Sequence, residues 1–102
     1  MKSLLALPAL LLTAHTLAAC PAAIPGEPPA IPDGRTATQE EMFEAQVATR
    51  AYVAAVEAWL ECRVGLHPLM HNRAVARAEQ SAEAYNEALH SFRQRGKLLA
   101  NN

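Results

Sequence analysis

The stretch Thr38–Val64 reads TQEEMFEAQVATRAYVAAVEAWLECRV and contains neither proline nor glycine. It opens on a capping box, in which Thr38 is followed three residues later by Glu41, a pattern typical of a helix start. Apolar and small residues then recur at alternating spacings of three and four, which places them on one helical face. That face consists of Met42, Ala45, Thr49, Tyr52, Val56 and Trp59, and Val53 and Leu60 widen it. The pattern predicts an amphipathic helix over residues 38–64.

A second helix is predicted over residues 68–95. Gly65 suits the position just past a helix, and Pro68 is tolerated in the first turn of the next one. Gly96 marks the expected end, and residues 97–102 are expected to form a disordered tail. The apolar seam of this helix is predicted to be Val75, Ala78, Ala82, Tyr85, Leu89 and Phe92. The short connection between the two helices predicts an all-α fold, an antiparallel two-helix hairpin over residues 38–96.

Residues 20–37 precede the hairpin and are predicted to form an extended, proline-rich N-terminal arm. Five prolines between positions 21 and 35 exclude a helix or a central strand, and a turn is expected at Pro32-Asp33-Gly34. A flexible tether has no need of branched apolar side chains, so Ile24 and Ile31 favour an arm that packs. The expected docking surface is a second, small-residue face of the first helix. It comprises Val47, Ala51, Ala54, Ala55, Ala58 and Cys62.

Residues 1–19 have the three parts of an export signal, namely Lys2, an apolar run over residues 4–12, and small residues after it. The run is too short to be a transmembrane helix. We therefore expect an exported protein of the periplasm or cell envelope, where disulfides persist. The segment Leu17-Ala18-Ala19-Cys20 also matches a lipobox, which would make Cys20 a lipidated N-terminus. An ordinary signal peptidase would accept Thr16-Leu17-Ala18 instead.

Cys20 and Cys62 are the two cysteines of the chain, and the sequence allows either a disulfide between them or lipidation of Cys20. A disulfide between them would leave no odd thiol and would stabilise the fold by about 4 kcal/mol in the chain-entropy estimate. Lipidation of Cys20 would anchor the protein to a membrane and leave Cys62 as a free thiol. One sulfur atom cannot take part in both bonds.

The remaining chemistry of the sequence is sparse. The net charge of -1 argues against nucleic acid as a partner. His67 and His71 are weak candidates for binding Zn²⁺ or Cu²⁺, since two ligands are too few and His90 lies far along the chain. The carboxylates are scattered over outer helix faces, where no shared site forms for acid–base chemistry. We expect neither an enzyme nor a bound cofactor.

A resemblance adds to this interpretation. Cys20, the segment Ile31-Pro32-Asp33-Gly34, the run Tyr52-Val53-Ala54-Ala55 and Cys62 resemble a group of small exported bacterial proteins. The later run from Asn72 to Phe92 shares the likeness, whereas His67 and His71 fall outside it. The resemblance implies a secreted helical protein in which the N-terminal and mid-helix cysteines form a disulfide. No activity is assigned to that group, so no functional site is carried over.

Together these features predict an exported, non-catalytic structural or protein-interaction module. Its alternative is a lipoprotein anchored through Cys20, and metal binding through histidines is a remote third possibility. The expected partner is another envelope protein or a second copy of the chain, because two helices alone bury little apolar surface. A homodimer would form a four-helix bundle.

Overall fold

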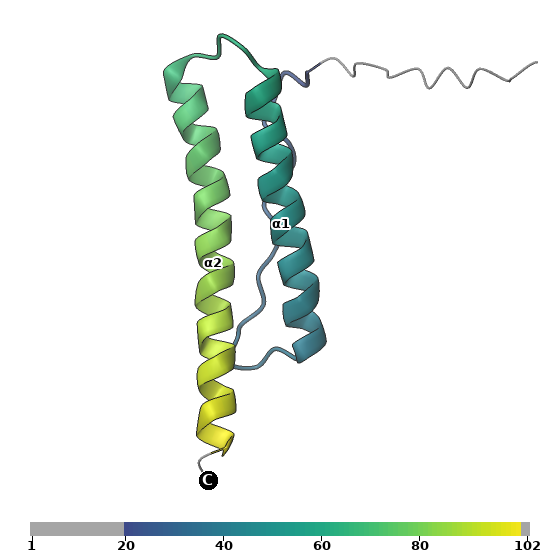
Figure 1. Cartoon of the computed structure of the whole chain (residues 1–102), viewed down its shortest axis with the longest axis vertical. Helices are drawn as coiled ribbons and strands as arrows, with labels where there is room; N and C mark the ends of the chain where they lie inside the picture. Colours follow the sequence, from purple (N-terminus) through teal and green to yellow (C-terminus); the bar gives the residue numbers. More distant parts are fainter. Residues whose placement is uncertain (1–19, 101–102) are drawn as a thin grey trace, which may run out of the picture.

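The structure is a computed structural model that describes residues 20–100, and it consists of two helices and an extended arm. Helix α1 spans Gln39–Cys62 and helix α2 spans Pro68–Ala100. The two helices lie side by side and run in opposite directions (Figure 1). This arrangement confirms the predicted all-α antiparallel hairpin. The expected signal over residues 1–19 lies outside the described residues.

Helix α1 begins where the capping pattern predicts. The Thr38 hydroxyl accepts a hydrogen bond from the Glu41 amide at 3.1 Å. Glu40 and Glu41 occupy the first turn, where negative charge interacts favourably with the helix dipole. All six residues of the predicted face are buried, namely Met42, Ala45, Thr49, Tyr52, Val56 and Trp59. The apolar period of this segment therefore identified its core-facing side correctly.

Residues 63–67 connect the helices. Gly65 takes a φ of 80°, a left-handed conformation that glycine adopts without a steric penalty. His67 then precedes the first residue of α2, and its Nδ1 accepts a hydrogen bond from the Leu69 amide at 3.1 Å. Its carbonyl oxygen accepts from the amides of Met70 and His71. His67 therefore acts as the N-terminal cap of α2.

Helix α2 differs from prediction in its buried face and in its end. Its buried residues are Ala74, Ser81 and Ala88, each one position before a predicted seam residue. All six residues of the predicted seam are half-buried, and Ala78, Tyr85, Leu89 and Phe92 pack against the core clusters. The helix also continues through Gly96 to Ala100, so the predicted stop at 95 and the disordered tail are wrong for residues 96–100. Lys97, Leu98 and Leu99 are good helix formers, and they outweigh the propensity cost of one glycine.

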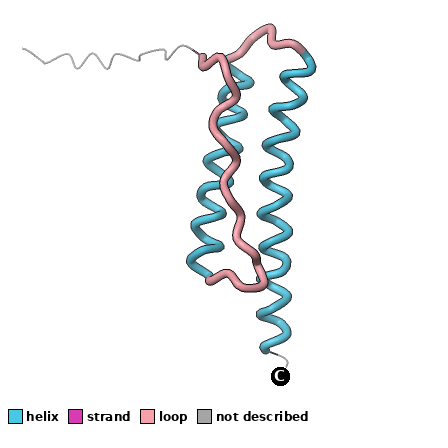
Figure 2. Tube along the Cα trace, turned by 180° about the vertical axis from the view of Figure 1, so that it is seen from behind, coloured by secondary structure: helices cyan, strands magenta, loops and turns pink. Residues whose placement is uncertain are grey.

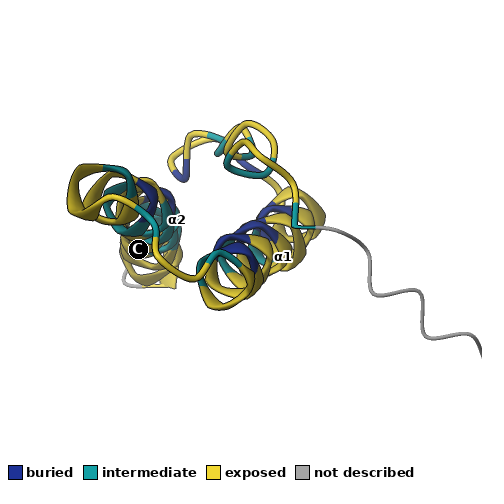
Figure 3. Cartoon of the chain, turned by 90° about the horizontal axis from the view of Figure 1, so that it is seen from above, coloured by how far each residue is buried: buried dark blue, intermediate teal, exposed yellow. Residues whose placement is uncertain are grey.

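The arm, residues 20–37, accounts for the shift of the most buried positions of α2 by one residue from the predicted seam. It runs back along the hairpin in the groove between the two helices (Figure 2). Seen from above, α1, α2 and the arm form three sides of a triangle (Figure 3). Small side chains on the arm-facing side of α2 let the extended backbone approach closely. The buried side of α2 therefore turns toward the arm.

The surface on which the arm docks differs from the predicted one. Near Cys62, residues Pro21 and Pro25 of the arm line a pocket together with Ala55 and Ala58 of the predicted small-residue face. The middle of that face, Val47, Ala51 and Ala54, remains exposed. A groove between two helices covers an extended chain on two sides, whereas one helix face covers it on only one. The two-helix groove therefore buries more of Ile24 and Ile31.

Each isoleucine of the arm packs against its own core cluster. Ile24 lies against the upper cluster of Tyr52, Val56, Trp59 and Ala74. Ile31 lies against the lower cluster of Ala37, Met42 and Ala88. These contacts confirm that the arm packs against the hairpin instead of acting as a tether.

The lower end of the arm is fixed by a tight turn and by one arginine. The carbonyl oxygen of Asp33 accepts hydrogen bonds from the amides of Thr36 and Ala37, so the turn falls slightly later than predicted. Gly34 packs directly on the backbone of α2, where a Cβ atom would overlap the carbonyl oxygen of Ala88. The guanidinium of Arg95 donates to the carbonyl oxygens of Arg35 and Ala37, at 2.8 and 2.7 Å. The start of α1 is thereby tied to the far end of α2.

Candidate functional site

The upper end of the arm carries the feature with the clearest chemistry, the pair Cys20 and Cys62. The structure joins the two residues in a disulfide, with their Cα atoms 5.8 Å apart. That separation lies within the ordinary range for a disulfide. The bond links the first residue of the arm to the last residue of α1, across 42 positions of sequence.

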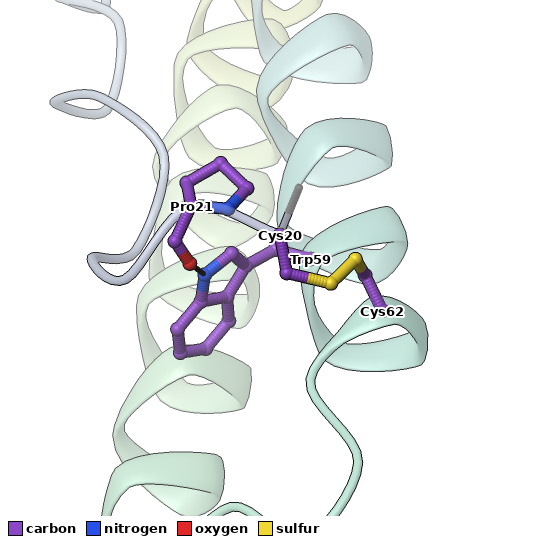
Figure 4. The surroundings of a disulfide bond; sticks show 4 residues. All are labelled: Cys20, Pro21, Trp59 and Cys62. Carbon is purple, nitrogen blue, oxygen red and sulfur yellow. Dashed lines mark hydrogen bonds between the residues drawn. A yellow bond between two sulfur atoms is a disulfide. The ribbon is translucent and has the colours of Figure 1, made fainter. Parts of the chain in front are cut away.

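Trp59 holds the same end of the arm by a second contact. Its side chain is 2% exposed, and its indole N–H donates to the carbonyl oxygen of Pro21 at 2.8 Å (Figure 4). Proline has no amide N–H, so the carbonyl is the hydrogen-bonding group that Pro21 can offer. Trp59 lies one turn before Cys62 on α1, and both side chains therefore reach the start of the arm. The Arg63 guanidinium lies 6.0 Å from the centroid of the indole ring.

The accessibility of the disulfide determines what it can do chemically. Cys62 is exposed and Cys20 is half-buried. Thiol–disulfide exchange needs access of a thiolate to one sulfur atom, and this bond offers such access. Both cysteines of the chain take part in the bond, so neither is a free thiol here. In this state the Cys20 sulfur is not available for a thioether to lipid.

The structure does not bring the two candidate metal ligands into a site. His67 uses its Nδ1 to cap α2, and His71 is exposed on the first turn of that helix. His90 lies five turns further along α2, near its other end. Within residues 20–100, no group of three or more histidine, cysteine or acidic side chains is placed to hold a metal ion.

The carboxylates of residues 20–100 are all exposed. One of them has an altered titration. Hydrogen bonds from the Arg35 side chain and amide hold the pKa of the Asp33 carboxyl below its ordinary value of 3.8. The Arg35 amide donates at 2.9 Å, and its guanidinium donates at 3.2 and 3.0 Å. This pair stabilises the turn of the arm, and a lowered pKa at an exposed position does not suit an acid catalyst.

Comparisons with protein families, with curated proteins and with solved structures found no match to this chain. Among the described residues, no helix is long and apolar enough to cross a membrane. The interpretation of the site therefore rests on the geometry of the chain.

Three residues that fix the arm were not singled out from the sequence for that role, namely Trp59, Gly34 and Arg95. The helical spacing places Trp59 on the core-facing side and does not show which group accepts from its N–H, although a buried tryptophan normally finds an acceptor. A glycine in a packed segment signals close backbone approach, but the sequence does not show which backbone approaches Gly34. Arg95 lies at the predicted end of the second helix, where a basic side chain suits the negative pole of the helix dipole. Nothing local indicates that its guanidinium reaches carbonyl groups 58 and 60 positions earlier.

Proposed function

We propose that the chain is an exported structural or protein-interaction module of the cell envelope, without catalysis. Its arm is fastened to the hairpin by the Cys20–Cys62 disulfide. The observation that carries the proposal is this bond, which closes the upper end of the groove. A disulfide of this kind persists in an oxidising compartment and is reduced in the cytosol. The signal-like residues 1–19 and the disulfide are therefore consistent with the same destination.

Two surfaces support an interaction role. The side of α1 that faces away from the core carries Phe43 and Val47, which are 63% and 52% exposed. The side of the hairpin opposite the arm is a groove between the two helices, lined by Val53, Ala82 and Leu89 among others. Apolar helix faces of this kind are typical of protein–protein contacts. The proposed partner is another envelope protein or a second copy of the chain.

The lipoprotein is the competing proposal, because residues 17–20 match a lipobox. It requires the sulfur atom of Cys20 for a thioether, and it leaves Cys62 as an exposed free thiol in an oxidising space. The fit of Cys20 to Cys62, with the Trp59–Pro21 hydrogen bond beside it, supports the disulfide instead.

The test is the intact mass of the protein purified from bacteria that express the full chain. We expect cleavage near residue 20, a mass two hydrogen atoms below the reduced formula, and no alkylation until the disulfide is reduced. A lipid-sized adduct with an alkylated Cys62 contradicts the disulfide and supports the anchor. A product that retains residues 1–19 contradicts export.

The variant Cys62→Ser is the matched control. If the disulfide forms, this variant gains an alkylatable thiol at Cys20 and remains in the soluble fraction. If Cys20 is lipidated, the same variant keeps its adduct and its membrane fraction unchanged.

A further inference from the structure

The lower end of the arm, residues 31–37, is fixed without the help of the disulfide. Ile31 packs against the lower core cluster, and Gly34 packs directly on the backbone of α2. Arg95 of α2 donates to two carbonyl oxygens of this segment, at 2.8 and 2.7 Å. None of these contacts involves Cys20, so the lower end should stay docked when the disulfide is broken.

The upper end of the arm, residues 20–25, depends on the disulfide. Beside that bond it has the hydrogen bond from Trp59 to Pro21 and the packing of Ile24 against the upper core cluster (Figure 4). Ile24 is only half-buried, and Pro21 is exposed. Breaking the disulfide therefore removes the main constraint on this end.

Gly26 lies between the two ends and has the properties of a hinge. Its φ is 53°, in the left-handed region, and a Cβ atom built on it would meet nothing within 4 Å. Gly26 is exposed, as are Glu27 and Pro28 after it. A glycine in open surroundings can change its backbone dihedral angles without a steric penalty. The upper end can therefore move away from the helices at Gly26 while the lower end stays in the groove.

We propose that the disulfide is a redox switch: its reduction by a dithiol opens the upper half of the groove by rotation at Gly26 and leaves the lower half closed. A thiolate of the dithiol attacks the sulfur atom of Cys62, the more exposed of the two cysteines. The S–S bond breaks, and the Cys20 sulfur leaves as a thiolate and takes a proton. The second thiol of the dithiol then displaces Cys62 from the mixed disulfide. The dithiol is oxidised by two electrons, and its two protons end on the two cysteines.

The surface that opens is apolar and carries one polar donor. The Trp59 N–H loses its acceptor when Pro21 leaves. Pro21 and Pro25 also line a pocket with Ala55 and Ala58, which become accessible to solvent when the two prolines move away. The switch rests on the disulfide of the proposed function, and it does not depend on export or on the partner.

Methyl NMR spectra of the protein purified from cells that express the full chain test the switch before and after reduction with dithiothreitol. The chain has two isoleucines, and each end of the arm carries one of them. On reduction we expect the Ile24 methyl signals to move to the position of an isoleucine in an unfolded chain. The Ile31 methyl signals should stay where they are in the oxidised protein, because the lower contacts persist.

Gly26→Ala and Gly65→Ala are a matched pair of variants for the hinge, since both glycines have a positive φ and open surroundings. Alanine at position 26 strains the docked arm but not the released one. The equilibrium constant for forming the disulfide with the glutathione couple should therefore fall about fivefold or more. Alanine at position 65 strains the connection between the helices in both redox states, so its constant should stay within about twofold of the parent.

A thiol assay before reduction separates failure of the disulfide from failure of the switch. Free thiols at that stage contradict the disulfide of the proposed function and the switch together. If the bond is present, Ile24 signals that do not move on reduction overturn the switch. So do Ile31 signals that move with them, whether the arm leaves as a whole or the chain unfolds. Equal constants for the two alanine variants contradict rotation at Gly26.

Discussion

At the scale of single residues, Trp59 links the helix pair to the arm. Its ring fills the upper core cluster with Tyr52 and Val56, and its N–H satisfies the carbonyl oxygen of Pro21. Tyr52 lies one helical heptad before it and is also buried, but its hydroxyl has no hydrogen-bond partner among the described residues. The two aromatic residues thus differ in whether their polar atom contributes to the fold.

This difference gives the first prediction. Trp59→Phe should lower the free energy of unfolding by at least about 1 kcal/mol, because it leaves the Pro21 carbonyl unpaired and removes ring volume. Tyr52→Phe removes a hydroxyl that makes no hydrogen bond. The free energy of unfolding of this variant should therefore stay within about 0.5 kcal/mol of that of the parent. Denaturant unfolding followed by circular dichroism measures both. Equal losses in the two variants would show that the hydrogen bond to Pro21 contributes nothing.

Asp33 gives a second prediction, which concerns pH. Its folded-state pKa is lowered by Arg35, so the pair stabilises the turn above pH about 3.8 and is lost as the pH falls through the lowered pKa. An NMR titration of the Asp33 carboxyl should therefore have its midpoint below 3.8. In Arg35→Ala the midpoint should rise toward the ordinary value, because the guanidinium is lost while the amide of residue 35 still donates to the carboxyl. A midpoint that is the same in both proteins contradicts the ion pair.

At the scale of secondary-structure elements, periodicity predicted α1 better than α2. In α1 one contiguous apolar face meets both α2 and the arm, so the three-four spacing identifies its buried side. In α2 the buried positions Ala74 and Ser81 are small, and a hydrophobicity pattern gives them little weight. Ala74 is buried against Tyr52, Val56 and Trp59 of α1, and Ile24 of the arm packs on the same cluster. Local patterns do not reveal contacts with segments so far away in the sequence.

The same substitution, glycine to alanine, tests this account of α2 at Gly34 and at Gly96. Gly34→Ala should lower the free energy of unfolding by about 1–3 kcal/mol, because the added Cβ overlaps the backbone of α2 at Ala88. Gly96→Ala meets open space within a helix and should raise it by about 0.5–1 kcal/mol. Thermal or denaturant unfolding measures the change. A neutral Gly34→Ala would show that the arm does not pack closely on α2.

At the scale of the whole molecule, the sequence was sufficient to predict the hairpin, the extended arm and its return toward Cys62. Capping residues, the Gly65–Pro68 break and the prolines each act locally, and local signals are what a single sequence displays. Contacts between three segments form the groove that receives the arm. The predicted docking surface, the small-residue face of α1, coincides with the observed one only near Ala55 and Ala58. The pairing of Cys20 with Cys62 could be proposed from the count of cysteines, but the contact of Trp59 with Pro21 depends on the folded geometry.

A core built from two helices and one arm is small, so the disulfide is expected to supply a large part of its stability. The bond constrains a loop of 42 positions in the unfolded chain. The chain-entropy estimate for a loop of this length is about 4 kcal/mol. Without the bond, the upper half of the arm is held mainly by Ile24 and by the Trp59 hydrogen bond.

The most direct test of the disulfide-fastened arm is the free energy of unfolding with and without the bond. It is measured by denaturant titration of the oxidised protein and of Cys20→Ser/Cys62→Ser. The emission of Trp59, the one tryptophan of the chain, reports on the docking of the arm. We predict that the double variant loses about 4 kcal/mol and that its native emission shifts to the red as Trp59 meets water. A loss under about 1 kcal/mol with unchanged emission would contradict the claim that the disulfide holds the arm in the groove.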